Sequence, residues 1–524
     1  MNLLRFLLLA ICLCSVALAA PAPPNIVIIL ADDLGYGDVQ CYNPKRGKIP
    51  TPNIDRLAAE GMRFTDAHTS SGVCSPTRYT LLTGRYHWRT QLQQGIVPVW
   101  GKPLIAPDRL TLASLAKQHG YRTACIGKWH LGRDWPITEA QRPFFAGFGG
   151  QAGGGGKVVK EATDAHRAAW QEVFSQPIPG GPTARGFDEY FGTDVPNWPP
   201  YCFIENDRTV GIPTELLPAA KLGNKQASLP GPAIKDWQLE PILPALADRA
   251  VDFIARQTKA KQPFFLYLPL TAPHTPIAVN TEWRGKSGLG NNYADFVMET
   301  DAAIGRVIDA IKTAGAAENT LVIFTSDNGC ASLVGVKELE AKGHFPSGPL
   351  RDYKTSVFEG GHRVPFIVRW PGTVKLGSVC AQLVHQADLL ATMAEVLGTK
   401  LPDHAGEDSF SLMPLFKGGD KPVREYAISC ASTGTPGLRK GPWKFIPTTA
   451  PQLYNLDTDL GETKNLATEK PELVAELRAT LEKSITDGRT TPGARQKNDV
   501  TVRRFPQSET AAPKSKAKAK QDKK

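Results

Sequence analysis

The chain has 524 residues, of which 41% are hydrophobic and 21% are charged, a composition typical of globular proteins with a substantial core. The formal net charge is +10, but the tail from Arg503 to Lys524 holds eight Lys/Arg and two acids and so supplies +6 of it. Because Arg5 supplies another +1, the body carries about +3 (10 − 6 − 1), and bulk charge does not indicate a nucleic-acid enzyme.

The N-terminus has the pattern of a signal peptide. Arg5 precedes an apolar run from Phe6 to Leu18, and the small residues Ala19 and Ala20 follow before Pro21. A membrane anchor is the alternative, although the run is short for a spanning helix. No later segment reaches eighteen uninterrupted apolar residues. We therefore expect an exported protein, periplasmic or secreted, without a transmembrane anchor.

Acidic and amide side chains follow two apolar segments that are typical of buried parallel strands. Asp32 and Asp33 come directly after Asn25 to Leu30, while Asp327 and Asn328 come after Leu321 to Thr325. Taken alone, the first acidic pair fits an exposed turn as well as a metal site. Because parallel strands present their carboxyl ends at one edge of a sheet, the two pairs together indicate a site for Ca²⁺ or Mg²⁺, which prefer oxygen ligands.

Cys74 opens the segment Cys74-Ser75-Pro76-Thr77-Arg78, and the apolar run from Tyr79 to Leu82 predicts the start of a helix. That would place Cys74 just before a helix N-terminus, where anions are favoured. The alternative is a structural or disulfide cysteine. Seven cysteines follow the leader, and if Cys74 is modified the other six allow up to three disulfides: Cys41, Cys125, Cys202, Cys330, Cys380 and Cys430.

Further basic and imidazole side chains stand at expected strand ends. Lys128 and His130 follow a predicted strand from Tyr121 to Ile126, and His274 follows the strand Pro263 to Leu270. Prolines on both sides of His274 should hold its loop rigid, which suits a proton donor. His362, in the segment from Tyr353 to Pro365, has no assigned role and reads as a loop histidine.

The Cys-x-Pro-x-Arg segment and the string from Gly120 to Gly132 both resemble signatures of the type I sulfatase family, over a similarity that spans roughly Asn25 to Ser484. Thr77 stands where many members have serine. The resemblance implies that Cys74 is oxidised to formylglycine by a formylglycine-generating enzyme and binds Ca²⁺ (Mg²⁺ being possible) together with Asp32, Asp33, Asp327 and Asn328. It further implies catalytic roles for Arg78, Lys128, His130, His274 and Lys354.

The same resemblance implies an α/β fold with a large mixed, mostly parallel sheet flanked by helices, as in the alkaline-phosphatase-like superfamily. We expect a signal peptide (1–20), a catalytic domain (21–418), a C-terminal subdomain with an antiparallel sheet (419–490) and a basic disordered tail (491–524). In the subdomain, strands are predicted over Tyr426 to Ser429, Gly441 to Ile446 and Gln452 to Asp457, with a helix over Pro471 to Ser484.

The expected activity is removal of sulfate from a sulfated carbohydrate or an aryl sulfate. Two alternatives remain open at this point. One is a phosphodiesterase or phosphonate monoester hydrolase of the same superfamily, since sulfuryl and phosphoryl groups are nearly isosteric. The other is a non-catalytic binder of sulfated glycans, which would follow if Cys74 were never converted.

Overall fold

The computed structural model describes residues 23–146, 161–222 and 228–506. The predicted signal peptide lies outside this range, as does the tail beyond residue 506. None of the helices in the described residues is both long enough and apolar enough to span a membrane.

The centre of the molecule is a ten-stranded sheet in the order β13-β2-β12-β11-β1-β10-β4-β5-β6-β7. Strands β11, β1, β10, β4 and β5 are parallel to their neighbours in this run, while β12, β6 and β7 pair antiparallel. The prediction of a mixed, mostly parallel sheet is therefore confirmed. The strands are β1 (Asn25–Ala31), β2 (Met62–Phe64), β4 (Arg122–Ile126), β5 (Glu189–Gly192), β6 (Ile204–Glu205), β7 (Arg208–Thr209), β10 (Phe264–Pro269), β11 (Thr320–Ser326), β12 (Phe366–Arg369) and β13 (Ser378–Cys380).

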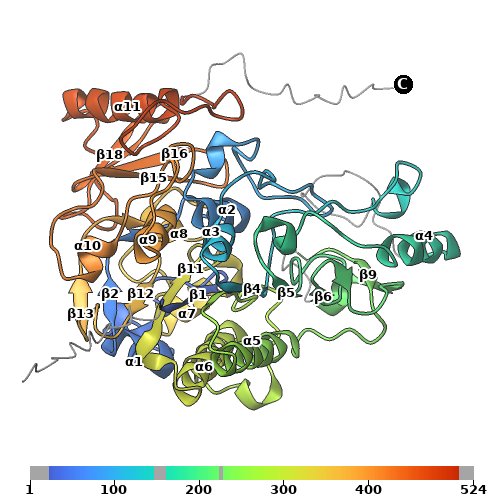
Figure 1. Ribbon diagram of the computed structural model, residues 1–524. Coiled ribbons are helices and arrows are strands. Elements are labelled where there is room, and N and C mark those ends of the chain that lie inside the picture. Colours follow the sequence, from blue (N-terminus) through green and yellow to red (C-terminus); the bar gives the residue numbers. More distant parts are fainter. Residues whose placement is uncertain (1–22, 147–160, 223–227, 507–524) are drawn as a thin grey trace, which may run out of the picture.

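Helices cover both faces of this sheet (Figure 1). Alternate residues of β1 point to opposite faces: Val27 and Ile29 join a core with α5 and α6, while Ile26 and Ile28 join a second core with α2, α3 and α9. Burial on both faces explains why β1 is a continuous apolar run. The helices are α1 (Pro52–Ala59), α2 (Cys74–Thr83), α3 (Leu112–Gln118), α5 (Ile242–Lys259), α6 (Asn292–Thr313) and α9 (Leu389–Val396).

Because β1, β4, β10 and β11 run in parallel, the loops after them all emerge at one edge of the sheet. Helices α5 and α6 precede β10 and β11, so each begins at this same edge and runs back towards the other. The loop that follows β10 and the loop that follows β1 contact each other there, because the amide of Asp32 donates to the carbonyl of Ala272. Adjacent loops thus carry most of the functional side chains predicted from the sequence: Asp32, Asp33, Lys128, His130, His274, Asp327 and Asn328.

The C-terminal subdomain has a separate antiparallel sheet of β15 (Tyr426–Cys430), β16 (Pro436–Lys440), β17 (Trp443–Ile446) and β18 (Gln452–Asn455), covered by α11 (Pro471–Thr486). Figure 1 shows it stacked beside the main sheet, with α11 outermost. Strand β16 was not predicted, because Pro436 and Gly437 weaken the strand pattern; Pro436 is tolerated as the first residue of the strand. The other elements are β3 (Ala67–His68), β8 (Glu215–Leu217), β9 (Gly231–Ala233), β14 (Val384–His385), α4 (Asp164–Phe174), α7 (Val336–Ala341), α8 (Glu359–His362) and α10 (Met413–Phe416).

The subdomain holds the segment that leads into Cys74. The amide of Cys430 donates to the carbonyl of Ser70, and the amide of Gly72 donates to the carbonyl of Cys430, both at 2.9 Å. The hydroxyl of Ser429 donates to the carbonyl of Thr69 at 2.6 Å. This backbone pairing makes residues 69–72 an extension of the C-terminal sheet, so docking of the subdomain fixes the approach to the cysteine.

A buried ionic cluster, formed by Lys444, Glu359 and Glu462, joins the two sheets. The ammonium group of Lys444 lies 2.9 Å from a carboxylate oxygen of Glu359 and 2.9 Å from one of Glu462. His362 lies 3.1 Å from the same nitrogen and 3.2 Å from the ring of His68. His362 is thus a buried interface residue, and the interpretation as a loop histidine is wrong.

Two further expectations need correction. The sequence allowed up to three disulfides, but all seven cysteines in the described residues are free thiols. Residues 491–506, which were predicted to belong to a disordered tail, are also in contact with the folded part of the chain. Val502 packs in the core under α11, and the carboxylate of Asp499 lies 3.0 Å from the buried guanidinium of Arg85.

Candidate active site

Cys74 is the first residue of α2, which is buried along its whole length. The helix begins before the predicted start at Tyr79, because Pro76 falls within the first turn, where its missing amide donor costs nothing. Gly84 ends the helix in the left-handed conformation at φ 62°. The N-terminus of a buried helix therefore points at the carboxyl edge of the sheet with Cys74 at its tip.

Two ammonium groups and a carboxylate surround the sulfur of Cys74. Lys128 Nζ lies 3.5 Å from Sγ, Lys354 Nζ lies 3.7 Å from it, and Asp32 Oδ1 lies 3.8 Å from it. The side chain is only 2% exposed. Burial raises the pKa of the thiol to about 12, although the two lysines act in the opposite direction. An unmodified thiol here stays protonated at neutral pH and is a weak nucleophile.

Arg78 joins the carboxylates from the two strand ends. Its guanidinium lies 2.8 Å from Asp327 Oδ2 and 3.1 Å from Asp32 Oδ1, with all three groups fully buried. Although burial opposes ionisation, Lys128 at 2.8 Å holds the pKa of Asp32 well below its ordinary value. Burial and the charge of Asp32 instead raise the pKa of Asp327 to about 7.

The oxygen donors at this edge suit a hard divalent cation. The amide nitrogen of Asn328 donates to Asp33 Oδ1 at 2.7 Å, which leaves Asn328 Oδ1 buried without a hydrogen-bond partner among the described residues. A buried amide oxygen without a donor is costly unless something binds it. Asp33 adopts φ 64°, a left-handed conformation that turns its carboxylate into the cluster. Asp32, Asp33, Asp327 and Asn328 thus form a set of ligands that fits Ca²⁺.

His130 is oriented by a backbone carbonyl. Its Nε2 lies 3.1 Å from the carbonyl oxygen of Val97, which can only accept, so the proton sits on Nε2. Its Nδ1 is then a lone-pair acceptor, and it is buried without a hydrogen-bond partner within the described parts of the chain. Burial, with Lys128 and Arg78 nearby, holds the pKa of His130 well below its usual range. The ring is therefore neutral and available to take a proton at Nδ1.

His274 and Lys354 face Asp33 from two other loops. Lys354 Nζ lies 2.7 Å from a carboxylate oxygen of Asp33, and His274 Nε2 lies 3.6 Å from Oδ2. The Nδ1–H of His274 donates to the carbonyl of Thr275, so Nε2 is the nitrogen that faces the cluster. Burial lowers the pKa of His274 to about 4. Although burial also disfavours the Lys354 ammonium, Asp33 raises its pKa above the ordinary value.

The structure brings every predicted site residue to one place, and it adds supporting residues that the sequence reasoning missed. Asp38 lies behind the metal loop, where it accepts from the amide of Gly35 at 2.8 Å, from the hydroxyl of Tyr293 at 2.5 Å and from His344 Nε2 at 2.9 Å. Tyr293 also donates to the carbonyl of Asp33. The sequence does contain a sign of this role: Asp38 is a third acidic residue shortly after the first acidic pair, and it lies in a glycine-rich turn.

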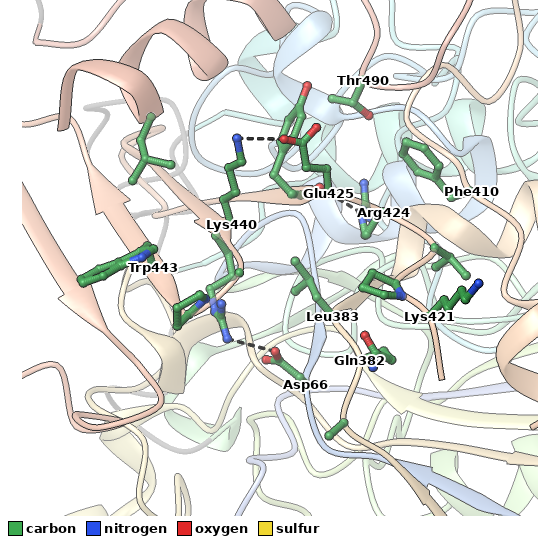
Figure 2. A pocket seen from close by; sticks show the side chains of 18 of the residues that line it. Asp66, Gln382, Leu383, Phe410, Lys421, Arg424, Glu425, Lys440, Trp443 and Thr490 are labelled. Carbon is green, nitrogen blue, oxygen red and sulfur yellow. Dashed lines mark hydrogen bonds and ion pairs between the residues drawn. The ribbon is translucent and has the colours of Figure 1, made fainter. Parts of the chain in front are cut away.

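A cavity of about 1230 Å³ opens elsewhere, between the main sheet and the C-terminal subdomain (Figure 2). It contains none of the residues around Cys74. Four acidic and four basic side chains line it, and some of them pair with one another: Lys440 with Glu425 at 2.8 Å and Arg439 with Asp66 at 3.1 Å. We therefore assign the functional site to the Cys74 cluster and not to the larger cavity.

Comparisons with known proteins agree with this geometry. Residues 24–399 match the family described as Sulfatase. The chain is 32% identical to the N-acetylgalactosamine-6-O-sulfatase of Bacteroides thetaiotaomicron, over 88% of this chain and 92% of that protein. It is 32% identical to human arylsulfatase A, over 88% and 86% of the two chains. A solved 6S-sulfatase from a B. thetaiotaomicron locus for glycosaminoglycan metabolism superimposes with a TM-score of 0.74 at 31% identity, over 88% of this chain and 98% of that one.

Proposed function

The chain belongs to the type I sulfatase family of the alkaline-phosphatase-like superfamily, and from this premise we propose that it removes sulfate from a sulfated carbohydrate. As a member of that family it is a sulfuric ester hydrolase. The observation that supports the proposal most is the convergence of Lys128, Lys354 and Asp32 within 3.8 Å of the sulfur of Cys74. Ammonium groups so placed can neutralise the oxygens of a sulfate ester positioned over that atom.

Cys74 is proposed to be converted to formylglycine, because the buried thiol with a pKa of about 12 is not a competent nucleophile. The hydrate of that aldehyde supplies a hydroxyl for attack at sulfur. Ca²⁺, held by Asp32, Asp33, Asp327 and Asn328, supplies positive charge for the sulfuryl oxygens. Conversion requires a formylglycine-generating enzyme as a partner, and the N-terminal sequence pattern supports export to the periplasm or the medium.

The side chains around Cys74 bind the sulfate group, position the acidic residues and transfer protons. Lys128 and Lys354 bind the sulfuryl oxygens, and Arg78 holds Asp32 and Asp327 in place through its guanidinium. His274 Nε2 faces the site and donates a proton to the departing oxygen. Its low pKa means that it holds this proton only when the anionic substrate is bound nearby. His130 Nδ1, with its free lone pair, accepts a proton from the second hydroxyl at the position of Cys74 so that sulfate can leave.

The names of the relatives indicate which substrates to test first. Two of them act on 6-sulfated sugars by name, and one is named for aryl sulfates. We propose a 6-O-sulfated N-acetylgalactosamine unit, or a closely related sulfated sugar, as the substrate, with aryl sulfates as incidental ones.

The test compares a sulfate ester and a phosphate ester of one leaving group, with wild-type protein and a Cys74→Ala variant. We expect hydrolysis of the sulfate ester only, and its loss in the variant. Faster hydrolysis of the phosphate ester, or an active variant, would contradict the proposal. Mass spectrometry of the peptide that contains Cys74 should show a mass about 18 Da below that of the thiol, because CH₂SH becomes CHO.

A further inference from the structure

A second cavity, of about 820 Å³, opens at the same edge of the sheet as the Cys74 cluster. Its walls come from the residues before α5, the loop that precedes α6 and the first residue of α6. The end of β8 at Leu217 and the 3-10 turn that follows it (Ala219–Leu222) complete them. Both long helices begin at this edge, and their N-terminal ends favour negative charge nearby. The volume is within the range of ordinary ligand sites. Its lining residues include Lys221, Trp237, Glu240, Pro276, Arg284 and Asn292.

The cavity begins close to the proposed proton donor. Pro276 lines it and stands two residues after His274. Since successive Cα atoms are at most about 3.8 Å apart, the two Cα atoms lie within about 7.6 Å of each other. This separation is within the span of one sugar residue, so a sugar joined to the leaving oxygen at His274 is close to the cavity wall at Pro276. A sugar bound there would be a neighbour of the sulfated one in a glycan chain.

Three charged side chains line the cavity, and two of them, Arg284 and Glu240, approach each other. Lys221 is exposed and makes no ion pair with any described residue. Arg284 is exposed; its Nε donates to the carbonyl of Val279, and one terminal nitrogen lies 3.6 Å from Glu240. Two cations against one partly exposed carboxylate leave the cavity with a net positive charge. This distinguishes it from the larger cavity, where four acidic residues balance four basic ones.

The remaining walls have the polar and aromatic character of carbohydrate sites. Trp237 is half-buried and packs against Phe203 with ring centroids 5.2 Å apart. Its indole N–H has no hydrogen-bond partner among residues 23–146, 161–222 and 228–506. Gln238 and Asn292 contribute exposed amides. An aromatic ring can pack against the C–H face of a sugar, while amides and cations bind its hydroxyl and acidic groups.

We propose that this cavity binds a negatively charged sugar residue adjacent to the sulfated one, through Lys221 and Arg284. The inference rests on the proposed function, which it deepens: the natural substrate is an acidic oligosaccharide, and its neighbouring residue carries a carboxylate or a second sulfate. Lys221 and Arg284 are then determinants of specificity and take no part in the chemical step.

The test uses a Lys221→Gln/Arg284→Gln double variant and three disaccharides with the same terminal sulfated sugar. The neighbouring residue is a uronate in the first, a sulfated hexose in the second and a neutral hexose in the third. The measured quantity is the ratio of kcat/KM for each acidic disaccharide to that for the neutral one. A Lys375→Gln variant serves as the control. It removes an exposed charge close to β13, which is the outermost strand of the main sheet.

We expect the double variant to lower this ratio about tenfold for at least one acidic disaccharide, through KM, and the control to leave it unchanged. The affected arm identifies the carboxylate or the sulfate as the group recognised. An unchanged ratio in both arms of a folded double variant overturns the inference. Titration of the same disaccharides into Cys74→Ala protein, with and without the double substitution, measures binding without turnover. If the wild type hydrolyses none of them, the proposed function fails, and this titration alone decides the inference.

Discussion

Substitution of Lys444 by Met should destabilise the protein strongly, because it leaves two buried carboxylates without their cation. Lys444 is 1% exposed and pairs with Glu359 and Glu462, both of which are buried. Removing one partner from a buried ion pair costs about 3–5 kcal/mol. Lys440, in the neighbouring strand of the same sheet, makes two carboxylate contacts at 2.8 and 2.9 Å, but its side chain is 27% exposed. Exposed pairs contribute about 0.2–1 kcal/mol each, so Lys440→Met is a matched control.

Urea denaturation, followed by intrinsic fluorescence, measures the free energy of unfolding of both variants. We expect a loss of about 3–5 kcal/mol for Lys444→Met and at most about 2 kcal/mol for Lys440→Met. A second substitution, Glu462→Gln, should recover part of the loss in the Lys444→Met background, because it removes one of the stranded charges. Equal effects for the two lysine variants, or no recovery, would refute the account of the buried cluster.

Three other predictions concern the site and its surroundings. Asn328→Ala should weaken Ca²⁺ binding in a calorimetric titration, because it removes a buried ligand oxygen; affinity equal to that of the wild type would exclude this residue from the site. His130→Ala should lower kcat by about 10²–10⁴ with a smaller effect on KM, since it removes the only proposed base, and steady-state kinetics on a sulfate ester measure this. Burial lowers the pKa of His87 to about 3, so below pH 6.5 His87 is protonated in the unfolded chain but stays neutral in the folded protein. The free energy of unfolding therefore decreases as the pH decreases, by about 2 kcal/mol at pH 5 for this residue. Between pH 7 and pH 5, urea denaturation of His87→Gln should show a loss of unfolding free energy smaller by that amount than in the wild type; an identical loss would contradict the assignment.

Much of the site follows from local sequence patterns. Asp32, Asp327 and Lys128 could be placed at one edge because each follows an apolar strand, and parallel strands present the same ends together. The ligand role of Asn328 came from its position beside Asp327. These inferences need only the period of the apolar residues and the direction of the strands, which a single sequence contains.

The contacts between distant segments could not be predicted. His362 and His68 lie far apart in the sequence, and their pairing depends on an isolated antiparallel bridge between His68 and Arg363. Strand β16 is stabilised by neighbours on both sides, which overrides the weak strand pattern at its start. The tautomer of His130 depends on a carbonyl from Val97, and sequence patterns do not specify such a contact.

The burial of Cys74 determines whether its modification can come before or after folding. The side chain is 2% exposed at the tip of a buried helix, with the C-terminal sheet closing the segment before it. A second enzyme has no access to that sulfur once the chain has folded. The proposed oxidation would therefore have to precede folding, during or soon after synthesis and before the C-terminal strands have docked. Under that proposal, protein that folds with an unmodified cysteine stays inactive until it unfolds again.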